Sequence, residues 1–419
     1  MRSDKRSLGI TVILAILAAT VSITAVPASA QEAVIHSFNN NGKDAADPVA
    51  SLVADSNGNL YGTTNEGGAY GYGTVFELSP KTGGGWTSKI LHNFNNNNID
   101  GYNPEASLIF DASGNLYGTT VNGGDYLYGT AFELSPSAGN WTEQILHGFG
   151  PDTTSDGWFP QASLVFDSAG NLYGTAPAGG IHGGGTVFEL TPGTGGAWTE
   201  TTLHSFKYNQ NSDGSVPLSG VLLGSSGNLY GTTYTGGTYG GGTVFEVSPE
   251  AGGAWTEALL YDFKNDNISK DANVPYAGLI SDAAGNLYGT GSSGGQFNYG
   301  AVFELSPNGG GGWTETVLHS FANNGKDGNT PQAGLIFDAA GNLYGTTFSG
   351  GAYNFGTAFE LSPKAGGGWT ERVLHSFNNN GKDGYNPSAG LIFGPNGKLF
   401  GSTGVGGAFG GGAVFEITP

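Results

Sequence analysis

Short apolar segments alternate with glycine-rich stretches along the whole chain after residue 30. Within residues 106–149, four segments have the composition of β-strands and are separated by turn residues: ASLIFD, NLYGTT, GTAFELSP and WTEQILHGF. We call such segments, in chain order, strands a, b, c and d. Helical spacing of apolar residues occurs nowhere in this region, and glycine at this density opposes helix formation. The pattern therefore predicts an all-β protein.

The four-strand pattern repeats seven times. The hexapeptide GNLYGT starts at Gly58, Gly114, Gly170, Gly227, Gly285 and Gly341, and a variant, GKLFGS, starts at Gly397. These starting residues, called marker glycines below, are 56 to 58 residues apart. Seven units of four antiparallel strands are typical of a seven-bladed β-propeller, with a linear β-solenoid as the alternative.

The two ends of the repeat region favour the ring. The last unit stops after its strand c, GGAVFEITP, whereas the region begins with AVIHSF, a strand d without its own a, b and c. A solenoid would leave both pieces unpaired. In a ring, Ala33–Phe38 pairs with Ala413–Ile417 and no blade edge stays open. We therefore predict a single seven-bladed propeller over residues 31–419, closed by its N-terminal strand.

The marker hexapeptide has a structural interpretation. Its Gly and Asn are typical of a tight turn between strands a and b. We expect its Leu and Tyr to pack between neighbouring blades. We expect its second Gly to permit a close backbone approach near the glycine-rich loop between strands b and c.

The chain resembles the GloVer tandem-repeat family, the "choice-of-anchor" secreted bacterial proteins. The motifs GNLYGTT, GG…GGGTVFEL and VLHSF…DG…P carry the resemblance, which extends from Ala33 to Pro419. The family is defined by its repeat, so the resemblance implies the propeller and no particular activity. Members often end in an anchoring tail, whereas this chain departs from that pattern and ends at Pro419 directly after a strand, which leaves surface anchoring open.

The first thirty residues predict a signal peptide. A basic start containing Arg2, Lys5 and Arg6 precedes an apolar stretch over 8–26 and the small-residue site Ala28-Ser29-Ala30. An N-terminal membrane anchor is the alternative. No other long apolar run occurs, so we expect no transmembrane segment after cleavage before Gln31. The prediction is a secreted protein, extracellular or periplasmic.

The net charge of the chain limits the classes of molecule that it can bind. The net charge is −20, and removal of residues 1–30 leaves 11 Lys and Arg against 33 Asp and Glu, a net charge of −22. Such a surface repels phosphate backbones, which argues against nucleic acid, and it favours a soluble monomer. The chain has no cysteine, so stability comes from packing without disulfides.

Two ionisable residues recur in nearly every unit. A Glu stands nineteen residues after each marker glycine, and strand d carries a His in six units and Tyr261 in the other. Because strands c and d are neighbours, Glu and His are expected to meet, as a general acid–base pair or as a structural hydrogen bond. A catalytic pair is needed once and a blade-to-blade contact in every blade, which favours the structural interpretation. The Trp that opens strand d in six units is likewise interpreted as packing.

The loops from strand d to the next strand a each contain an Asp fourteen residues before the marker glycine. In NNNIDG, residues Asn96, Asn98 and Asp100 imitate the start of a calcium loop, although Ser107 stands where the closing Glu would be. Asp-Gly is also an ordinary turn. No cofactor is predicted, with calcium left as a possibility.

The loops from strand b to strand c carry a ring twelve residues after the marker glycine in every unit, and four units have a second ring two residues later. Both sets of loops are expected on one face, where aromatic planes among Asn and Asp suit sugars. The alternative is a lid of packed rings. Units 2 and 3 deviate most from the repeat. We therefore predict a ligand site there, formed by Tyr102, Asp125, Tyr126, Tyr128, Asp156, Trp158, Phe159 and His182.

The residues outside the repeat form no recognisable catalytic set, so no catalytic residue is predicted. The favoured function is a non-enzymatic secreted propeller that binds an extracellular glycan or a protein through its aromatic, Asp-rich face. A polysaccharide lyase or hydrolase is one alternative. Arg372 is the only Arg after residue 30, which argues against a lyase that must neutralise a substrate carboxylate. A structural envelope protein without a ligand is the other alternative.

Overall fold

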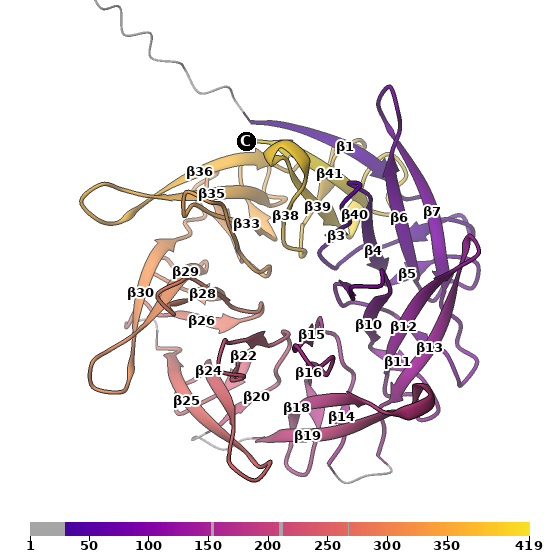
Figure 1. Cartoon of the computed structure of the whole chain (residues 1–419). Coiled ribbons are helices and arrows are strands. Elements are labelled where there is room, and N and C mark those ends of the chain that lie inside the picture. Colours follow the sequence, from indigo (N-terminus) through magenta and orange to yellow (C-terminus); the bar gives the residue numbers. More distant parts are fainter. Residues whose placement is uncertain (1–29, 152–154, 209–212, 267) are drawn as a thin grey trace, which may run out of the picture.

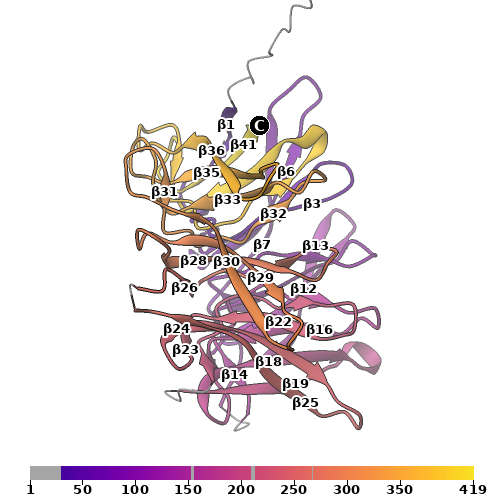
Figure 2. The same cartoon turned by 90° about the vertical axis from the view of Figure 1, so that its left-hand side faces the viewer.

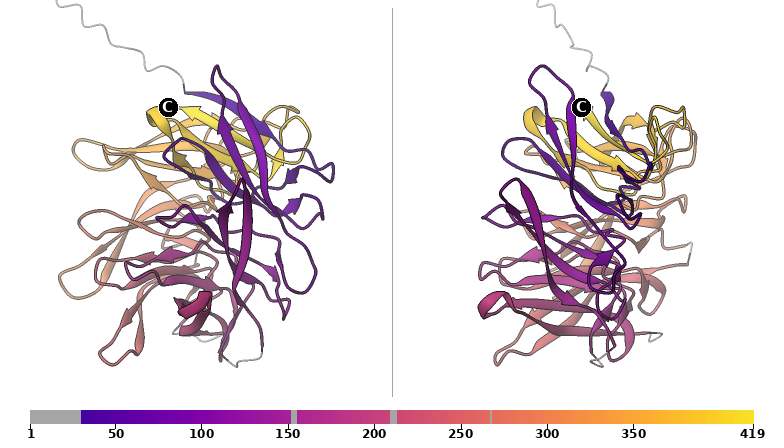
Figure 3. Two further views of the ribbon diagram at one scale, coloured as in Figure 1. Left: turned by 45° about the vertical axis from the view of Figure 1, so that its right-hand side comes forward. Right: turned by 90° about the vertical axis from the view of Figure 1, so that its right-hand side faces the viewer.

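The computed structural model describes residues 30–151, 155–208, 213–266 and 268–419. The predicted signal peptide lies outside the described residues, apart from Ala30. In the described ranges no helix is long and apolar enough to cross a membrane. Seven antiparallel sheets surround a central axis (Figure 1), and from the side they form a thick disc (Figure 2, Figure 3). The predicted seven-bladed propeller is confirmed.

The blades are numbered from the first complete unit, and their strands a to d run outward from the axis. Blade 1 consists of β3 (Val53–Ala54), β4 (Leu60–Thr64), β6 (Thr74–Pro80) and β7 (Trp86–Asn93), and blade 2 of β9 (Ile109–Phe110), β10 (Leu116–Thr120), β12 (Thr130–Ser137) and β13 (Asn140–Gly148). Blade 3 consists of β15 (Val165–Phe166), β16 (Leu172–Ala176), β18 (Gly183–Pro192) and β19 (Trp198–Lys207), and blade 4 of β21 (Leu222–Leu223), β22 (Leu229–Thr233), β24 (Gly240–Pro249) and β25 (Trp255–Lys264).

Blades 5 to 7 follow the same order. They are β27 (Ile280–Ser281), β28 (Leu287–Gly294), β29 (Ala301–Pro307), β30 (Trp313–Ser320); β32 (Ile336–Phe337), β33 (Leu343–Thr347), β35 (Thr357–Pro363), β36 (Trp369–Ser376); and β38 (Ile392–Phe393), β39 (Leu399–Thr403), β41 (Ala413–Thr418), β1 (Gln31–Ser37). Two short 3-10 turns, Thr194–Gly196 and Pro395–Gly397, complete the regular structure of the described residues.

The N-terminal strand closes the ring. β1 pairs antiparallel with β41 from Gln31 opposite Thr418 to Ser37 opposite Ala413, and the two strands lie side by side in Figure 1. A second contact crosses the same junction near the axis, where the Ser402 hydroxyl donates to the Ala50 carbonyl oxygen at 2.9 Å. The predicted closure is therefore confirmed.

Both sets of loops leave the same face of the disc, as predicted. In six blades a short ribbon joins the loop before strand a to the loop after strand b. These ribbons pair β2 (Ala45–Ala46) with β5 (Glu66–Gly67), β8 (Gly101–Tyr102) with β11 (Asn122–Gly123), β14 (Gly157–Trp158) with β17 (Ala178–Gly179), β20 (Gly214–Ser215) with β23 (Thr235–Gly236), β31 (Gly328–Asn329) with β34 (Ser349–Gly350), and β37 (Gly384–Tyr385) with β40 (Val405–Gly406). In blade 5, β26 (Ala272–Pro275) pairs with β28 itself. We call this side the loop face.

The hydrophobic core is divided among the junctions between neighbouring blades. At each junction a buried Phe at the end of strand d meets, edge to face, a buried Phe on strand c of the next blade; Phe94 and Phe132, for example, have centroids 5.3 Å apart. The Leu of the marker hexapeptide lies in the same clusters, as Leu116 does. The Trp that opens strand d packs there too, with Trp141 6.4 Å from Tyr61. The predicted packing roles of Leu, Tyr and Trp are confirmed.

The marker turn depends on an aspartate as well as on glycine. Asp111 Oδ1 accepts the backbone N–H groups of Ser113 and Asn115, each at 2.8 Å, and Gly114 takes a φ of 85° that favours glycine. The second glycine has a different role from the predicted one. A Cβ at Gly118 would lie 2.8 Å from the tip of the Phe132 ring, so this glycine makes room for a core side chain and not for the glycine-rich loop.

Deletion of residues 31–37 removes the outer strand of blade 7 and exposes the edge of β41. We expect the melting temperature to fall by roughly 10 °C or more, with aggregation, because an open edge pairs with other chains. Differential scanning calorimetry and light scattering measure both effects.

A circular permutant is the matched control. It joins Pro419 to Gln31 by a short linker and opens the chain in the exposed turn between Gly83 and Gly84, which moves the closure to blade 1. This permutant is expected to melt close to the parent. A deletion variant as stable as the parent would show that the ring does not depend on β1.

Candidate functional site: the loop face and the channel mouth

The aromatic residues of the loop face divide into two sets. The rings twelve residues after the marker glycine are exposed, with exposed fractions between 40% and 62%: Tyr70, Tyr126, Tyr239, Phe297, Tyr353 and Phe409. Three of the four rings two residues later pack against the next blade, as Tyr72 does on Tyr102 at 5.3 Å and Phe355 on Tyr385 at 5.2 Å, whereas Tyr299 is 42% exposed. The interpretation as surface rings fits the first position, and the interpretation as a lid fits three of the four rings at the second.

Three of the predicted ligand residues form one cluster. The Tyr128 ring lies 5.0 Å from Trp158 and 5.3 Å from Phe159, and all three are half-buried. The Trp158 indole Nε1 is buried without a hydrogen-bond partner. Beside this cluster Asp125 is exposed, and the Tyr126 ring covers the backbone at Gly150.

The other predicted ligand residues lie elsewhere. Tyr102 belongs to the junction between blades 1 and 2. His182 is exposed in blade 3 and lines a cavity of about 330 Å³ together with His204 and Lys207. Asp156 is 3% exposed, and its carboxylate accepts the backbone N–H of Gly150 at 3.0 Å. Units 2 and 3 therefore supply residues to three successive junctions and not to one constellation.

The calcium candidates Asn96, Asn98 and Asp100 do not form a loop around a common centre. Asn96 and Asn98 are exposed, whereas Asp100 is buried and directed toward His92 on β7. The turn is held instead by Asn97, whose side-chain oxygen accepts the backbone N–H groups of Ile99 and Asp100.

A cavity of about 570 Å³ lies on the axis of the ring. Each unit contributes the residue that follows its loop proline, and this position differs from unit to unit: Val49, Glu105, Gln161, Leu218, Tyr276, Gln332 and Ser388. The residue after the loop proline lies three residues before the Leu or Val of strand a. At this residue the chain turns from the loop face into the channel. We call this set the channel mouth.

Two tyrosines mark one side of the channel mouth. The Tyr276 ring, 39% exposed, stands edge to face against Tyr234 at 5.7 Å. Burial, followed by the charges of Glu105 and Tyr234, raises the pKa of Tyr276. Burial and the neighbouring Asp47 carboxylate raise the pKa of Glu105. The mouth therefore combines an aromatic wall, a carboxyl group with a raised pKa and two amides.

Sequence reasoning missed the channel mouth. It concentrated on bulky residues of units 2 and 3, whereas Tyr234 and Tyr276 belong to units 4 and 5. A signal was present, since the residue after the loop proline varies within a segment that six of the seven units write as Pro-x-Ala-Ser/Gly-Leu. Its convergence on the axis follows only from closure of the ring.

The repeated histidines contact aspartates and not the glutamates of strand c. Glu133 lies opposite Gln144, whereas His147 lies opposite Ala131, so the strand register separates the expected pair. His147 Nε2 lies instead 3.1 Å from Asp156 Oδ2 in the following loop. The expected Glu–His contact was wrong, and the structural interpretation of the histidine now rests on this aspartate.

A second glutamate approaches five of the six His–Asp pairs from the next blade. It stands two residues after the Trp of strand d, as Glu143 does beside His92 and Asp100. Burial, followed by the charge of Asp100, raises the pKa of Glu143 to about 9. At the junction of blades 4 and 5, burial and the charge of Asp271 raise the pKa of Glu315 to about 8, against a backbone hydrogen bond that lowers it.

Fold and site together define a β-propeller with a variable cavity at its axis. The sequence matches the Gloeobacter/Verrucomicrobia repeat in three overlapping stretches, residues 19–218, 144–336 and 275–419. The chain belongs to this repeat family. A comparison with curated proteins gives no sequence match.

Solved structures share the fold at low identity. An ancestral GH74 enzyme is similar over 92% of this chain, with a TM-score of 0.55 and 12% identity, and the chain spans only 50% of that enzyme's length. A PL25 ulvan lyase, bound to -[GlcA(1-4)Rha3S]- in one structure, is similar over 92% of this chain and 95% of its own, with a TM-score of 0.53 and 12% identity. At this identity the likeness extends to the fold alone.

The raised pKa of Glu315 predicts a dependence of stability on pH. The groups that face it are Asp271, Tyr261 and Lys264. Because the folded pKa of about 8 exceeds the ordinary 4.5, folding favours the protonated carboxyl group. This contribution is complete below about pH 4.5 and is lost as the pH rises through about 8. Glu315→Gln is therefore expected to melt like the parent at pH 5 and several degrees higher at pH 9.

Thermal unfolding followed by circular dichroism at both pH values measures this difference. Glu66→Gln, at an exposed position on β5, is the control and is expected to change little at either pH. A Glu315→Gln variant that is less stable than the parent at pH 9 would mean that the charged carboxylate is the stabilising form.

Proposed function

We propose that this protein is a secreted, non-enzymatic propeller that binds a neutral extracellular glycan at its channel mouth. The observation that carries the proposal is the unrepeated Tyr276, which faces Glu105 across a cavity that Gln161 and Gln332 also line. A position that varies from unit to unit is not needed for the fold, which leaves it available for a ligand.

The chemistry of the mouth suits a sugar. The C–H face of a pyranose packs on an aromatic ring such as Tyr276, while amide and carboxyl groups exchange hydrogen bonds with hydroxyl groups. Ligand sites generally combine an apolar wall with a few polar groups in this manner. A cavity of about 570 Å³ has room for one or two sugar units.

The charges favour a neutral glycan. Among the described residues that line the cavity, none is basic, and Glu105 contributes negative charge. A uronic acid or sulfated sugar would meet no counter-charge there and would approach a chain of net charge −20. The same argument disfavours a nucleic acid.

The predicted aromatic cluster supports an extended site. Phe159 and Pro160 connect Trp158 to Gln161 of the mouth, so a chain leaving the cavity over blade 3 would pass the Tyr128–Trp158 pair. The exposed rings farther out, such as Tyr126, would then contact a longer polymer. Action outside the cell or in the periplasm, as a monomer released by cleavage before Gln31, is part of this proposal.

A second candidate is a polysaccharide hydrolase. Glu105 lies at the mouth and Asp47 beside it, and burial raises the pKa of both carboxyl groups, in each case with help from a neighbouring negative charge. A pair of carboxyl groups, one of them protonated, is the minimum that glycoside hydrolysis requires. The resemblance in fold to a GH74 enzyme makes this candidate worth testing.

Neutral gluco-, xylo-, manno- and galacto-hexasaccharides are the probes, titrated by calorimetry. Tyr276→Ala is expected to weaken binding of the preferred probe by about 2 kcal/mol, roughly 30-fold, because an aromatic wall is lost. Trp158→Ala is expected to weaken it less. Tyr353→Ala, on the exposed rim of blade 6, is the control and is expected to bind like the parent.

Equal affinity of Tyr276→Ala and the parent would move the site away from the mouth. Binding of no hexasaccharide would favour a protein partner or a structural envelope role. Release of reducing ends by the parent, abolished in Glu105→Gln while binding persists, would establish the hydrolase in place of the binding protein.

A further inference from the structure

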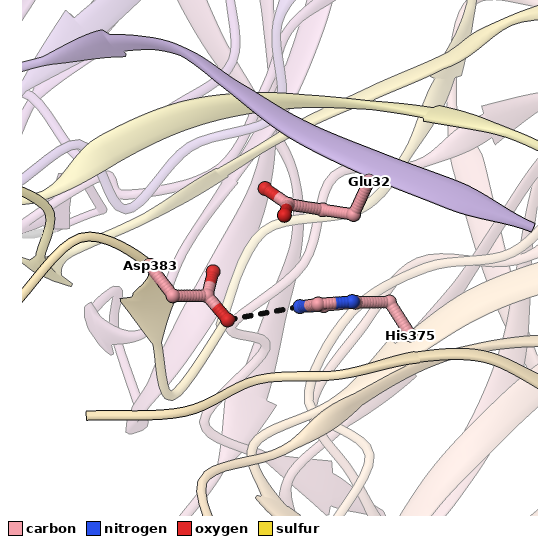
Figure 4. Close-up of side chains that lie close together, drawn as sticks. All are labelled: Glu32, His375 and Asp383. Carbon is pink, nitrogen blue, oxygen red and sulfur yellow. Dashed lines mark hydrogen bonds and ion pairs between the residues drawn. The ribbon is translucent and has the colours of Figure 1, made fainter. Parts of the chain in front are cut away.

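Three junctions between blades bring a histidine and two carboxylates to one point. The groups are Glu32 with His375 and Asp383, His92 with Asp100 and Glu143, and His204 with Asp213 and Glu257, and in each group the ligand atoms lie within 4.8 Å of one another. Figure 4 shows the first group, with Glu32 above the His375–Asp383 pair. Each group draws on the outer strands of two blades and on the loop between them.

The group at the junction of blades 1 and 2 has unsatisfied polar atoms directed into it. His92 Nε2, Asp100 Oδ1 and Glu143 Oε1 are buried without a hydrogen-bond partner, and Asp100 as a whole is only 7% exposed. Buried polar atoms are normally paired, and two carboxylates side by side repel each other. A positively charged ion placed between them would pair with the buried polar atoms and would remove the repulsion between the carboxylates.

The spacing of the atoms suits a small metal ion. His92 Nε2 lies 3.4 Å from Asp100 Oδ2, which also accepts the Asn95 backbone N–H at 2.9 Å, and 3.7 Å from Glu143 Oε1. Ligands about 2.1 Å from a tetrahedral ion are about 3.4 Å apart. The His92 side chain is 19% exposed but its Nε2 atom is buried, so a fourth ligand would be a water molecule enclosed with the ion.

We propose that these three His–Asp–Glu groups bind zinc or a similar divalent transition-metal ion. One imidazole nitrogen and two carboxylate oxygens with an open fourth position are donors that zinc accepts. Calcium is disfavoured, because it takes about six to eight oxygen ligands and these groups offer a nitrogen. The predicted calcium possibility is thus replaced, at Asp100, by a different ion bound to different partners.

Bound ions would cross-link the outer strands of neighbouring blades. His92 lies on β7 and Glu143 on β13, the outer strands of blades 1 and 2. At the closure, His375 lies on β36 of blade 6 and Glu32 on β1, so an ion there would hold the closing strand to the preceding blade. The ions would add stability to the outer edge of the ring, where the hydrophobic clusters end.

The remaining junctions provide internal comparisons. Ser88 replaces the glutamate between blades 7 and 1, and Tyr261 replaces the histidine between blades 4 and 5. Between blades 2 and 3, Glu200 Oε1 already accepts the Thr202 hydroxyl at 3.1 Å. Between blades 5 and 6, His319, Asp327 and Glu371 are all present, but their ligand atoms do not all lie within 4.8 Å of one another. The three junctions with complete, close groups are therefore the ones expected to bind an ion.

Zinc chloride is titrated into chelator-stripped, full-length mature protein at pH 7.5, with calorimetry, elemental analysis after gel filtration and thermal unfolding as readouts. We expect three zinc ions per chain and a higher melting temperature with zinc than with chelator. Calcium chloride is expected to give neither effect. Uptake of no zinc would overturn the proposal and would leave a shared proton as the partner of each carboxylate pair.

Matched variants locate the ions. Glu143→Gln and His92→Gln are each expected to bind two ions instead of three, while their melting temperatures in chelator confirm that they fold. Glu200→Gln, the equivalent change at the junction of blades 2 and 3, is expected to keep all three. Three ions in both Glu143→Gln and His92→Gln would also overturn the assignment of this site.

Discussion

Each blade can bury its apolar surface only against the next blade, and the rest of the structure depends on this constraint. The contact is the same at every junction: a Phe after strand d, such as Phe149, meets a Phe on the following strand c, such as Phe188, 5.0 Å away. A single blade has no core of its own, so the stable unit is the closed ring. The N-terminal strand β1 closes the ring by pairing with β41.

Closure creates two environments from one repeat. Residues on the strands meet the same neighbours seven times, which explains why Leu, Phe and Trp recur with little change. The residue after each loop proline instead converges on a single axis, where seven different side chains face one cavity. If the residue after the loop proline were the same in every unit, seven equal side chains would share one small space. Because this residue varies, the cavity has distinct sides, with Tyr276 on one and Glu105 on another.

The outer edge of six of the seven junctions carries an acidic pair that packing alone does not explain. Burial of Glu143 beside Asp100 raises the pKa of the glutamate to about 9, so the fold favours a proton or a cation between the two groups. A chain without cysteine cannot use disulfides to hold its outer strands. Charge neutralisation at the junctions is an alternative means of joining them.

The sequence by itself determined the fold. The period of the marker hexapeptide, the four strand-like segments per unit and the displaced strand at the N-terminus specified the number of blades and the closure, because each is a local or periodic property of the chain. It also identified the loop face, since antiparallel strands place alternate loops on one side. The exposed rings at Tyr70 and its equivalents were predictable for the same reason.

Only the tertiary structure decided the partners of individual side chains. The His147–Asp156 contact depends on strand register and on the path of a loop, and the approach of Glu200 from the next blade depends on how two blades pack. The expected contact between Glu133 and His147 does not form for this reason. Two strands can be neighbours while their register keeps these two side chains apart. Tyr276 and Glu105, 171 positions apart in the sequence, share a cavity because the ring closes, and no local pattern contains that information.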